Sequence, residues 1–194
     1  MLARLGRLLA SVACCAALAA CTSDATAESP PPRSSSDPPT TAVSTTGEPT
    51  STTKPPPPTM PALARQHSTA GAKAFVGYYA ASLNYSWDAK SSSLLRSLAA
   101  PNCSACRAVA TEIDRANAVG AQKIGGNWDP LSFYVPPTEP ADEPIVSVSV
   151  QVSKGSYRAS ASSPRRHIAA GINHFDFVLA WSQHRWLITE LRST

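Results

Sequence analysis

The sequence predicts an α+β fold in which three N-terminal helices pack on one curved antiparallel sheet of about four to six strands. Apolar residues between Ala72 and Val119 recur at the spacing of amphipathic helices. Beyond Gly120 the period of the apolar residues changes from about 3.6 to 2, which is typical of half-buried strands. Helices followed by strands of this kind indicate that the helices cover one face of the sheet.

The first expected helix covers residues 72–87. Ser68 or Thr69 can cap its start, because their hydroxyls accept a hydrogen bond from a free backbone N–H group. A second, short helix is expected over residues 93–99. Pro101 closes it, since the residue before a proline is disfavoured in the helical region.

The third expected helix covers residues 103–119, and Gly120 suits the left-handed position that ends a helix. After it, strands are expected at residues 124–135 with a break at Asp129-Pro130, at 146–152, at 157–161, at 175–181 and at 185–191. A turn is expected near residues 182–184. Arg165, Arg166 and His167 follow Pro164 and are interpreted as a solvated loop.

Residues 1–20 have the pattern of a signal peptide. A basic start with Arg4 and Arg7 precedes an apolar run at residues 8–20. The run is about 13 residues long, whereas a membrane-spanning helix needs about 20. We therefore expect this segment to be removed rather than kept as a transmembrane helix.

Residues 18–21, Leu-Ala-Ala-Cys, resemble the lipobox of bacterial lipoproteins at each of its four positions. The resemblance implies a diacylglycerol on the Cys21 thiol, cleavage after Ala20, further acylation such as palmitate, and anchorage on the extracytoplasmic face of the cell membrane. More than one acyl chain is needed for stable anchoring, and a lipidated cysteine supplies them. The alternative is an ordinary signal peptide cut at an Ala-x-Ala-like site at residues 17–19.

Residues 21–59 combine Cys21 with a linker that consists mostly of Pro, Ser and Thr. Such a composition cannot bury enough apolar surface to offset the entropy of ordering the chain, so we expect a disordered stalk. Ser/Thr tracts with proline are also candidates for O-glycosylation, and an unmodified spacer is the alternative. The remaining residues, 60–194, have the usual size of one domain.

The charge pattern excludes one class of partner. The chain holds 17 Lys and Arg against 13 Asp and Glu, a formal net charge of +4, and the basic residues are scattered. Nucleic-acid binding needs a basic patch or stripe, so we expect no nucleic-acid partner. The membrane is the expected partner through the lipid anchor, together with a cell-wall, lipid or protein partner for the domain.

The order of the elements resembles the nuclear-transport-factor-2-like cone, also called SnoaL-like or cystatin-like. Residues 60–194 also resemble the actinobacterial DUF6318 lipoprotein family, which implies this fold and location and adds no mechanism. The segments that carry the second resemblance are Met60-Pro61-Ala62-Leu63-Ala64, residues 67–76, Leu83-Asn84-Tyr85, the Cys103-x-x-Cys106 motif and the late Phe/Trp-rich strand pair.

Cys103 and Cys106 are the cysteines that remain once the signal peptide is cut and Cys21 is lipidated. An even pair in an oxidising compartment indicates a disulfide, and residues three apart on a helical turn are close enough to form one. A redox role would need the motif directly after a strand, and a helical segment precedes it here. A metal site lacks a second ligand pair, so no metal is expected.

Two features of the domain are candidates for a functional role, namely a histidine–aspartate pair and a set of aromatic residues. His174 and Asp176 share one face of a strand, as an acid/base pair would, but they fall on the face opposite the apolar residues and are interpreted as solvated. A cone of this type places aromatic side chains around a ligand pocket at its mouth. The six aromatic residues predicted to line it are Tyr79, Trp87, Trp128, Tyr134, Trp181 and Trp186.

The sequence predicts a surface-exposed lipoprotein with a non-catalytic binding or interaction domain, with no catalytic residue and no cofactor. The alternative is a small-molecule-binding protein or a SnoaL-like enzyme of the isomerase or hydrolase type that uses the aromatic pocket. Such enzymes use a carboxylate in apolar surroundings, so a buried acid with a raised pKa would favour this alternative. The acids that could take that role are Asp88, Glu112, Asp114 and Asp176.

Overall fold

A computed structural model describes residues 56–194. The expectations for the signal peptide, for Cys21 and for the linker as far as residue 55 therefore lie outside the described residues. The elements, in chain order, are the 3₁₀ helix η1 Ala62–Arg65, the helices α1 Thr69–Asp88, α2 Ser93–Ser97 and α3 Ser104–Ala118, and the strands β1 Gln122–Gly125, β2 Trp128–Tyr134, β3 Ile145–Val152, β4 Gly155–Arg158, β5 Arg166–Ile168, β6 Gly171–Ser182 and β7 Arg185–Ser193.

The three expected helices are confirmed, with boundaries set by local signals. Ser68 caps α1, since its Oγ accepts a hydrogen bond from the Gly71 N–H at 3.1 Å. Gly120 has φ +67° and ends α3 in the left-handed conformation. The three α-helices follow η1 and span residues 69–118, so they lie in the middle of the chain and not at its N-terminus. Ala99, between α2 and α3, forms a parallel bridge to β7.

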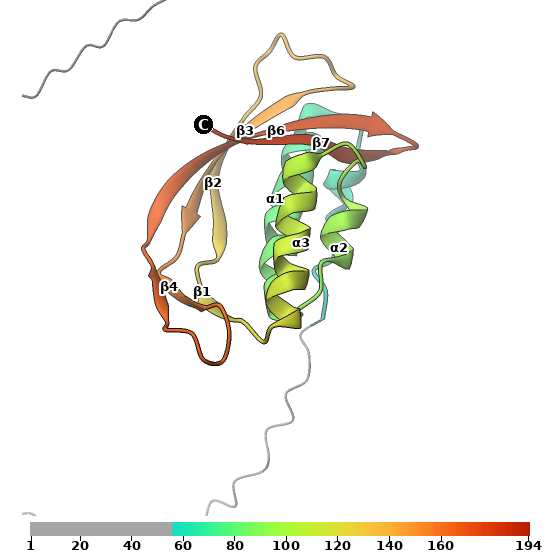
Figure 1. Cartoon of the computed structure of the whole chain (residues 1–194). Coiled ribbons are helices and arrows are strands. Elements are labelled where there is room, and N and C mark those ends of the chain that lie inside the picture. Colours follow the sequence, from blue (N-terminus) through green and yellow to red (C-terminus); the bar gives the residue numbers. More distant parts are fainter. Residues whose placement is uncertain (1–55) are drawn as a thin grey trace, which may run out of the picture. The chain divides into compact units, whose positions relative to one another are not determined.

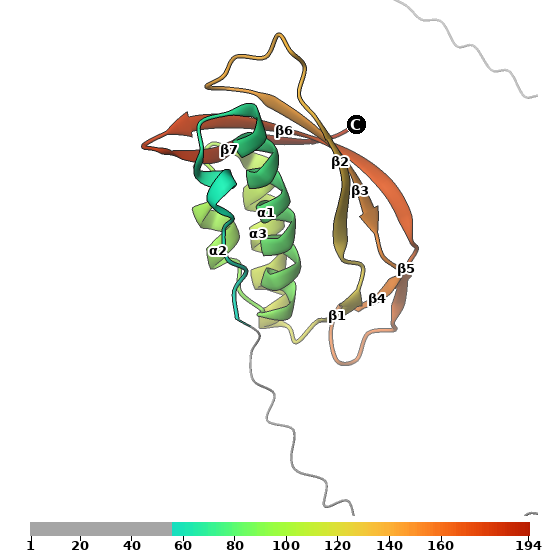
Figure 2. The ribbon, with the colours of Figure 1, turned by 180° about the vertical axis from the view of Figure 1, so that it is seen from behind.

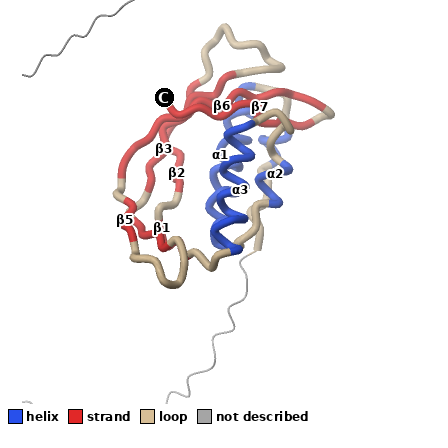
Figure 3. The backbone as a smooth tube through the Cα atoms, viewed as in Figure 1, coloured by secondary structure: helices blue, strands red, loops and turns tan. Residues whose placement is uncertain are grey.

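Within residues 56–194, seven strands form two antiparallel sheets. Figures 1 and 3 show how the strands curve beside the helices. The larger sheet has the order β2-β3-β6-β7, and the smaller one has the order β1-β4-β5. The expectation of one continuous sheet is thus corrected to two. Short connections join β1 to β2, β3 to β4 and β5 to β6. Each of them links a strand of the smaller sheet to a strand of the larger one, so the two sheets adjoin at their ends.

Glycines mark the place where one sheet gives way to the other. Gly125 and Gly126 have φ +65° and +64°, and Gly125 is paired with Gly155. A Cβ on Gly155 would overlap the backbone of Ile124 and Gly126, so this close approach requires glycine. The predicted break at Asp129-Pro130 was wrong, because Pro130 lies inside β2, where the pairing register shifts.

The basic segment at residues 165–167 is also corrected. Arg166 and His167 belong to β5, a three-residue strand at the edge of the smaller sheet, rather than to a solvated loop. A strand this short leaves almost no alternation of apolar and polar residues, so its sequence carries little signal. Both side chains are nevertheless exposed.

The core lies between the helices and the concave face of the larger sheet (Figures 1 and 2). Helix α1 packs against β2 and β3, and α3 packs against β7. Fully buried side chains from both layers meet there, and the largest are Trp186, Tyr79, Phe75, Phe177, Leu95 and Ile113. Burial of this apolar surface is the main force that holds the two layers together.

The segment that leads into α1 is fixed to the tip of the β6–β7 hairpin. The predicted turn is confirmed, with Gln183 and His184 both at positive φ, as a two-residue hairpin loop requires. The His67 ring stacks on Trp181 with ring centroids 4.9 Å apart. The Trp186 Nε1–H donates to the backbone oxygen of Gln66 at 3.0 Å. These contacts set where the chain enters the folded domain.

Candidate functional site

A cavity of about 370 Å³ opens where α1 and α3 end and β1 begins. Trp87 forms one wall, and Ile113, Ala116 and Ala121 form an apolar floor. The polar part of the lining comes from Asp88, Lys90, Asn117, Gln122 and Lys123. The volume of this cavity lies at the lower end of the range of roughly 300–1,000 Å³ that is usual for small-molecule sites.

The cavity forms because three chain ends meet. Trp87 and Asp88 are the last residues of α1, and the chain reverses at Lys90, which has φ +54°. The left-handed residue Gly120 then turns the chain out of α3, so that Gln122 and Lys123 enter β1 beside the same opening.

Lys123 is the principal charge of this cavity. Its Nζ donates to the backbone oxygen of Gly125 at 2.7 Å and lies 5.8 Å from the centre of the Trp87 ring. Burial lowers the pKa of this ammonium group, and the nearby Asp88 carboxylate opposes that effect. The ammonium group has therefore lost part of its hydration and can regain favourable interactions from a bound anion.

Tyr157 of β4 contacts Trp87, the aromatic residue that lines the cavity. Its ring contacts Trp87 edge-on at 6.3 Å between centroids, and its hydroxyl lies 3.5 Å from the Glu112 carboxylate. Arg115 holds Glu112 through two hydrogen bonds, of 2.9 and 2.6 Å. An aromatic wall, an apolar floor and a partly buried cation together suit a small molecule that has an apolar body and a negative group.

The six aromatic residues predicted to line a pocket are spread over the domain. Trp87 lines the cavity. Tyr79 lies in the core, edge-on to Phe177, where burial raises the pKa of its hydroxyl to about 12. Its hydroxyl has no hydrogen-bond partner among the described residues. Trp128 stacks on Phe175 at 4.3 Å.

The other three lie elsewhere. Trp186 is 1% exposed and packs edge-on against Trp181, with ring centroids 4.9 Å apart. Tyr134 is 58% exposed and lines a shallow cleft on the larger sheet. The sequence shows that a residue is aromatic, but not whether its ring faces the core, the surface or a cavity. The environments of these six rings could therefore not be predicted from the sequence.

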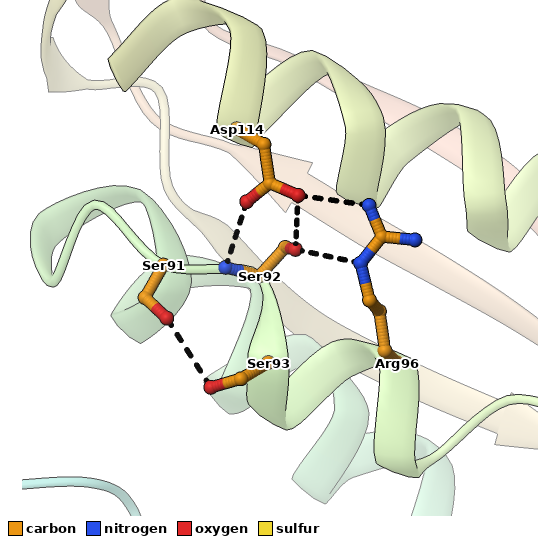
Figure 4. Close-up of polar contacts among 5 residues, drawn as sticks. All are labelled: Ser91, Ser92, Ser93, Arg96 and Asp114. Atoms are coloured by element: carbon orange, nitrogen blue, oxygen red, sulfur yellow. Dashed lines mark hydrogen bonds and ion pairs between the residues drawn. The ribbon is translucent and has the colours of Figure 1, made fainter. Parts of the chain in front are cut away.

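None of the four carboxylates weighed for an enzyme is buried. Asp88 and Asp114 are exposed, and Glu112 and Asp176 are half-buried. Figure 4 shows Asp114 accepting hydrogen bonds from the Ser92 hydroxyl and the Arg96 guanidinium, both at 2.8 Å. These bonds hold its pKa below the ordinary value of 3.8, which is opposite to the shift that an acid catalyst needs.

His174 and Asp176 each have a serine partner on the neighbouring strand. The Ser149 hydroxyl is 3.0 Å from His174 Nδ1, and the Ser147 hydroxyl donates to Asp176 Oδ1 at 2.7 Å. The pair lies on the face of the larger sheet that is turned away from the core, as expected.

The predicted disulfide between Cys103 and Cys106 is confirmed, with the two Cα atoms 5.3 Å apart. Both residues are buried, and Cys103 caps α3 by accepting a hydrogen bond from the Cys106 N–H at 3.2 Å. The bond therefore fixes the turn that starts α3. Within residues 56–194 no three His, Cys, Asp or Glu side chains gather as a metal site would require.

Sequence reasoning missed the role of Lys123 and Tyr157. Nothing in a short strand such as Gln122–Gly125 marks one lysine as half-buried, because its burial depends on the ends of α1 and α3. Tyr157 was expected only as part of a strand. Its contact with Trp87 joins residues 70 positions apart, which a local pattern does not encode.

The fold and the cavity define a small α+β domain with an open, ligand-sized cavity at one end of its helices. Residues 45–192 match the model of DUF6318, a family of unknown function. The match spans well over half of the chain, and the chain therefore belongs to this family.

Among solved structures, the chain is similar to the crystal structure of the intermembrane space region of the chloroplast protein ARC6. The identity is 11%, the likeness covers 63% of this chain and 93% of that chain, and the TM-score is 0.48. A likeness at this level does not establish a shared fold. None of the curated proteins matches the chain. In the described part, no helix combines the length and the apolar character that crossing a membrane requires.

Proposed function

We propose that this chain is a lipoprotein, held on the extracytoplasmic face of a bacterial membrane through Cys21, whose domain binds a small amphiphilic ligand without transforming it. The anchor rests on the Leu-Ala-Ala-Cys sequence at residues 18–21. The cavity beside Trp87 and Lys123 carries the binding function, because it offers an apolar surface and a partly buried positive charge in one place.

We also propose that the domain is a cone of the nuclear-transport-factor-2-like type and that the family is actinobacterial. The curvature of the larger sheet around α1 and α3 supports the cone (Figure 1). The enzyme alternative needs a carboxylate in apolar surroundings, and the described acids are all exposed or half-buried. This favours binding over catalysis.

The anchor is tested by mass spectrometry of the mature chain and of a Cys21→Ala variant. We expect the mature chain to begin at a cysteine that carries diacylglycerol and to partition into detergent. The Cys21→Ala chain is expected to lose the lipid and to leave the membrane fraction. A mature chain that starts elsewhere and carries no lipid would refute the anchor.

The cavity is tested with the fluorescent probe 8-anilinonaphthalene-1-sulfonate, which has an aromatic body and one negative charge. Ala116→Trp, which fills the cavity floor, should abolish the fluorescence increase seen with the wild type. The matched control is Val119→Trp, since Val119 is 45% exposed next to the end of α3 and does not line the cavity.

Lys123→Gln provides a second, milder variant. This variant removes the positive charge that would pair with the sulfonate of the probe. Probe binding should weaken about tenfold, which corresponds to roughly 1.4 kcal/mol. Near-ultraviolet circular dichroism verifies that each variant keeps its packed core, because loosely packed states also bind this probe. Equal binding by the wild type and the folded Ala116→Trp protein would place the probe outside the cavity.

A further inference from the structure

The face of the larger sheet turned away from the helices carries ordered rows of polar side chains. In one row Tyr134 of β2 lies opposite Ser147 of β3, which lies opposite Asp176 of β6. In the next row Ser132, Ser149 and His174 are opposite one another in the same way. Neighbouring strands lie about 4.8 Å apart, so each row presents hydrogen-bonding groups at nearly even spacing.

These side chains are held in position by each other. The Ser147 hydroxyl donates to Asp176 Oδ1 at 2.7 Å, and Ser149 pairs with His174 Nδ1 at 3.0 Å. Within the described chain this leaves Asp176 Oδ2, His174 Nε2 and the Tyr134 hydroxyl without a side-chain hydrogen bond. These groups are thus preorganised on the sheet, which lowers the entropic cost of binding a ligand there.

A shallow cleft of about 310 Å³ lies over these rows. Tyr134 lines this cleft and is 58% exposed, so most of its ring is free to contact a ligand. Arg192, opposite Asp176, is paired with Glu190, so the Asp176 carboxylate leaves one negative charge at the cleft. The cleft therefore combines an exposed ring with hydroxyl and imidazole groups and one carboxylate, and its negative charge disfavours an anionic ligand.

We propose that this cleft is a second binding site and that its ligand is an uncharged glycan chain. The Asp176 carboxylate accepts hydrogen bonds from sugar hydroxyls, and such charge-assisted bonds are the stronger ones. A sugar hydroxyl can either donate to or accept from His174 Nε2, according to the tautomer of the ring. The Tyr134 ring gives the apolar face of a sugar ring a surface to pack on. Strand spacing of about 4.8 Å is comparable with the width of one sugar ring.

Other classes of macromolecule fit the same face less well. A nucleic acid would need a basic patch, and the one arginine beside the cleft is already paired. A protein interface has an apolar core with several anchoring side chains, whereas the rows here are mostly serine, histidine and aspartate. This site lies on the other side of the sheet from the helices, so it is independent of the cavity beside Trp87.

The test is isothermal titration of the full chain with chitohexaose, cellohexaose and maltohexaose. We expect at least one of them to bind. Tyr134→Ala and Asp176→Asn should each weaken that binding about tenfold or more, because each removes a stacking surface or a charged acceptor. Tyr134→Phe keeps the ring and should retain most of the affinity.

The matched control is Val119→Ala, which truncates a side chain that is 45% exposed at the end of α3, lines neither cavity and should leave glycan binding like that of the wild type. Ala116→Trp, which fills the other cavity, should also leave glycan binding unchanged, so failure of one site does not mimic failure of the other. The proposal is overturned if none of the three glycans binds, or if Tyr134→Ala and Asp176→Asn both bind as tightly as the wild type.

Discussion

Asp114 shows how one exposed carboxylate can join two helices. It accepts hydrogen bonds from Arg96 of α2 and from the backbone and hydroxyl of Ser92 (Figure 4). The Arg96 hydrogen bond contributes most to lowering the pKa of this carboxyl group, followed by the Ser92 hydroxyl. Because the folded-state pKa lies below the ordinary value, the folded state binds this proton less tightly than the unfolded chain does.

The stabilisation by Asp114 is therefore fully present above the ordinary pKa of 3.8 and is lost as the pH falls through the lowered folded-state value. We expect Asp114→Asn to reduce the free energy of unfolding at pH 7, and its difference from the wild type to shrink as the pH falls below 3.8. Urea titrations at a series of pH values measure this. Asp129→Asn, an exposed carboxylate on β2, should show no such convergence.

Phe177 and Ile172 test whether burial decides the cost of a truncation on one strand. Phe177 is 1% exposed and Ile172 is 55% exposed, and both belong to β6. Phe177→Ala should lower the free energy of unfolding by about 3–5 kcal/mol, because it leaves a cavity in the core. Ile172→Ala should stay within about 0.5 kcal/mol. Similar losses in urea denaturation for both variants would contradict the assignment of the inner face.

Among the elements, the helices and the strands with a long periodic pattern could be predicted, whereas the shortest strand could not. The alternation of valine with serine at residues 146–152 identified β3, and the helical spacing with Ser68 and Gly120 identified α1 and the end of α3. β5 has three residues and was missed. One strand was expected at residues 124–135 with an interruption at Asp129-Pro130, whereas the chain passes from β1 to β2 at Gly126, where Gly155 approaches the backbone closely.

Gly155→Ala tests the junction of the sheets. A Cβ there would meet the backbone of Ile124 and Gly126, which cannot move as a flexible side chain could. We expect a loss of about 1–3 kcal/mol and faster amide hydrogen exchange in β4 and β5. Gly171→Ala is the matched control, since nothing lies within 4 Å of a Cβ at the start of β6. Unchanged exchange in Gly155→Ala would show that the junction tolerates a side chain.

For the molecule as a whole, the sequence indicated the α+β class and the disulfide, but it did not locate the candidate site. Of the six aromatic residues expected around a pocket, Trp87 lines the cavity beside Lys123. The cavity is made by the ends of α1 and α3 and the start of β1, and no local pattern reports how such ends meet. Tertiary packing also determines that Tyr79 and Trp186 belong to the core.

The most direct measurement is native mass spectrometry of the full chain, purified gently from the membranes of the cells that produce it. We predict one small additional mass on the wild type beyond the lipid on Cys21. The same mass should be absent from Ala116→Trp and present on Val119→Trp. A wild-type chain that carries no such mass, or an Ala116→Trp chain that retains it in full, would contradict a ligand in the cavity between α1, α3 and β1.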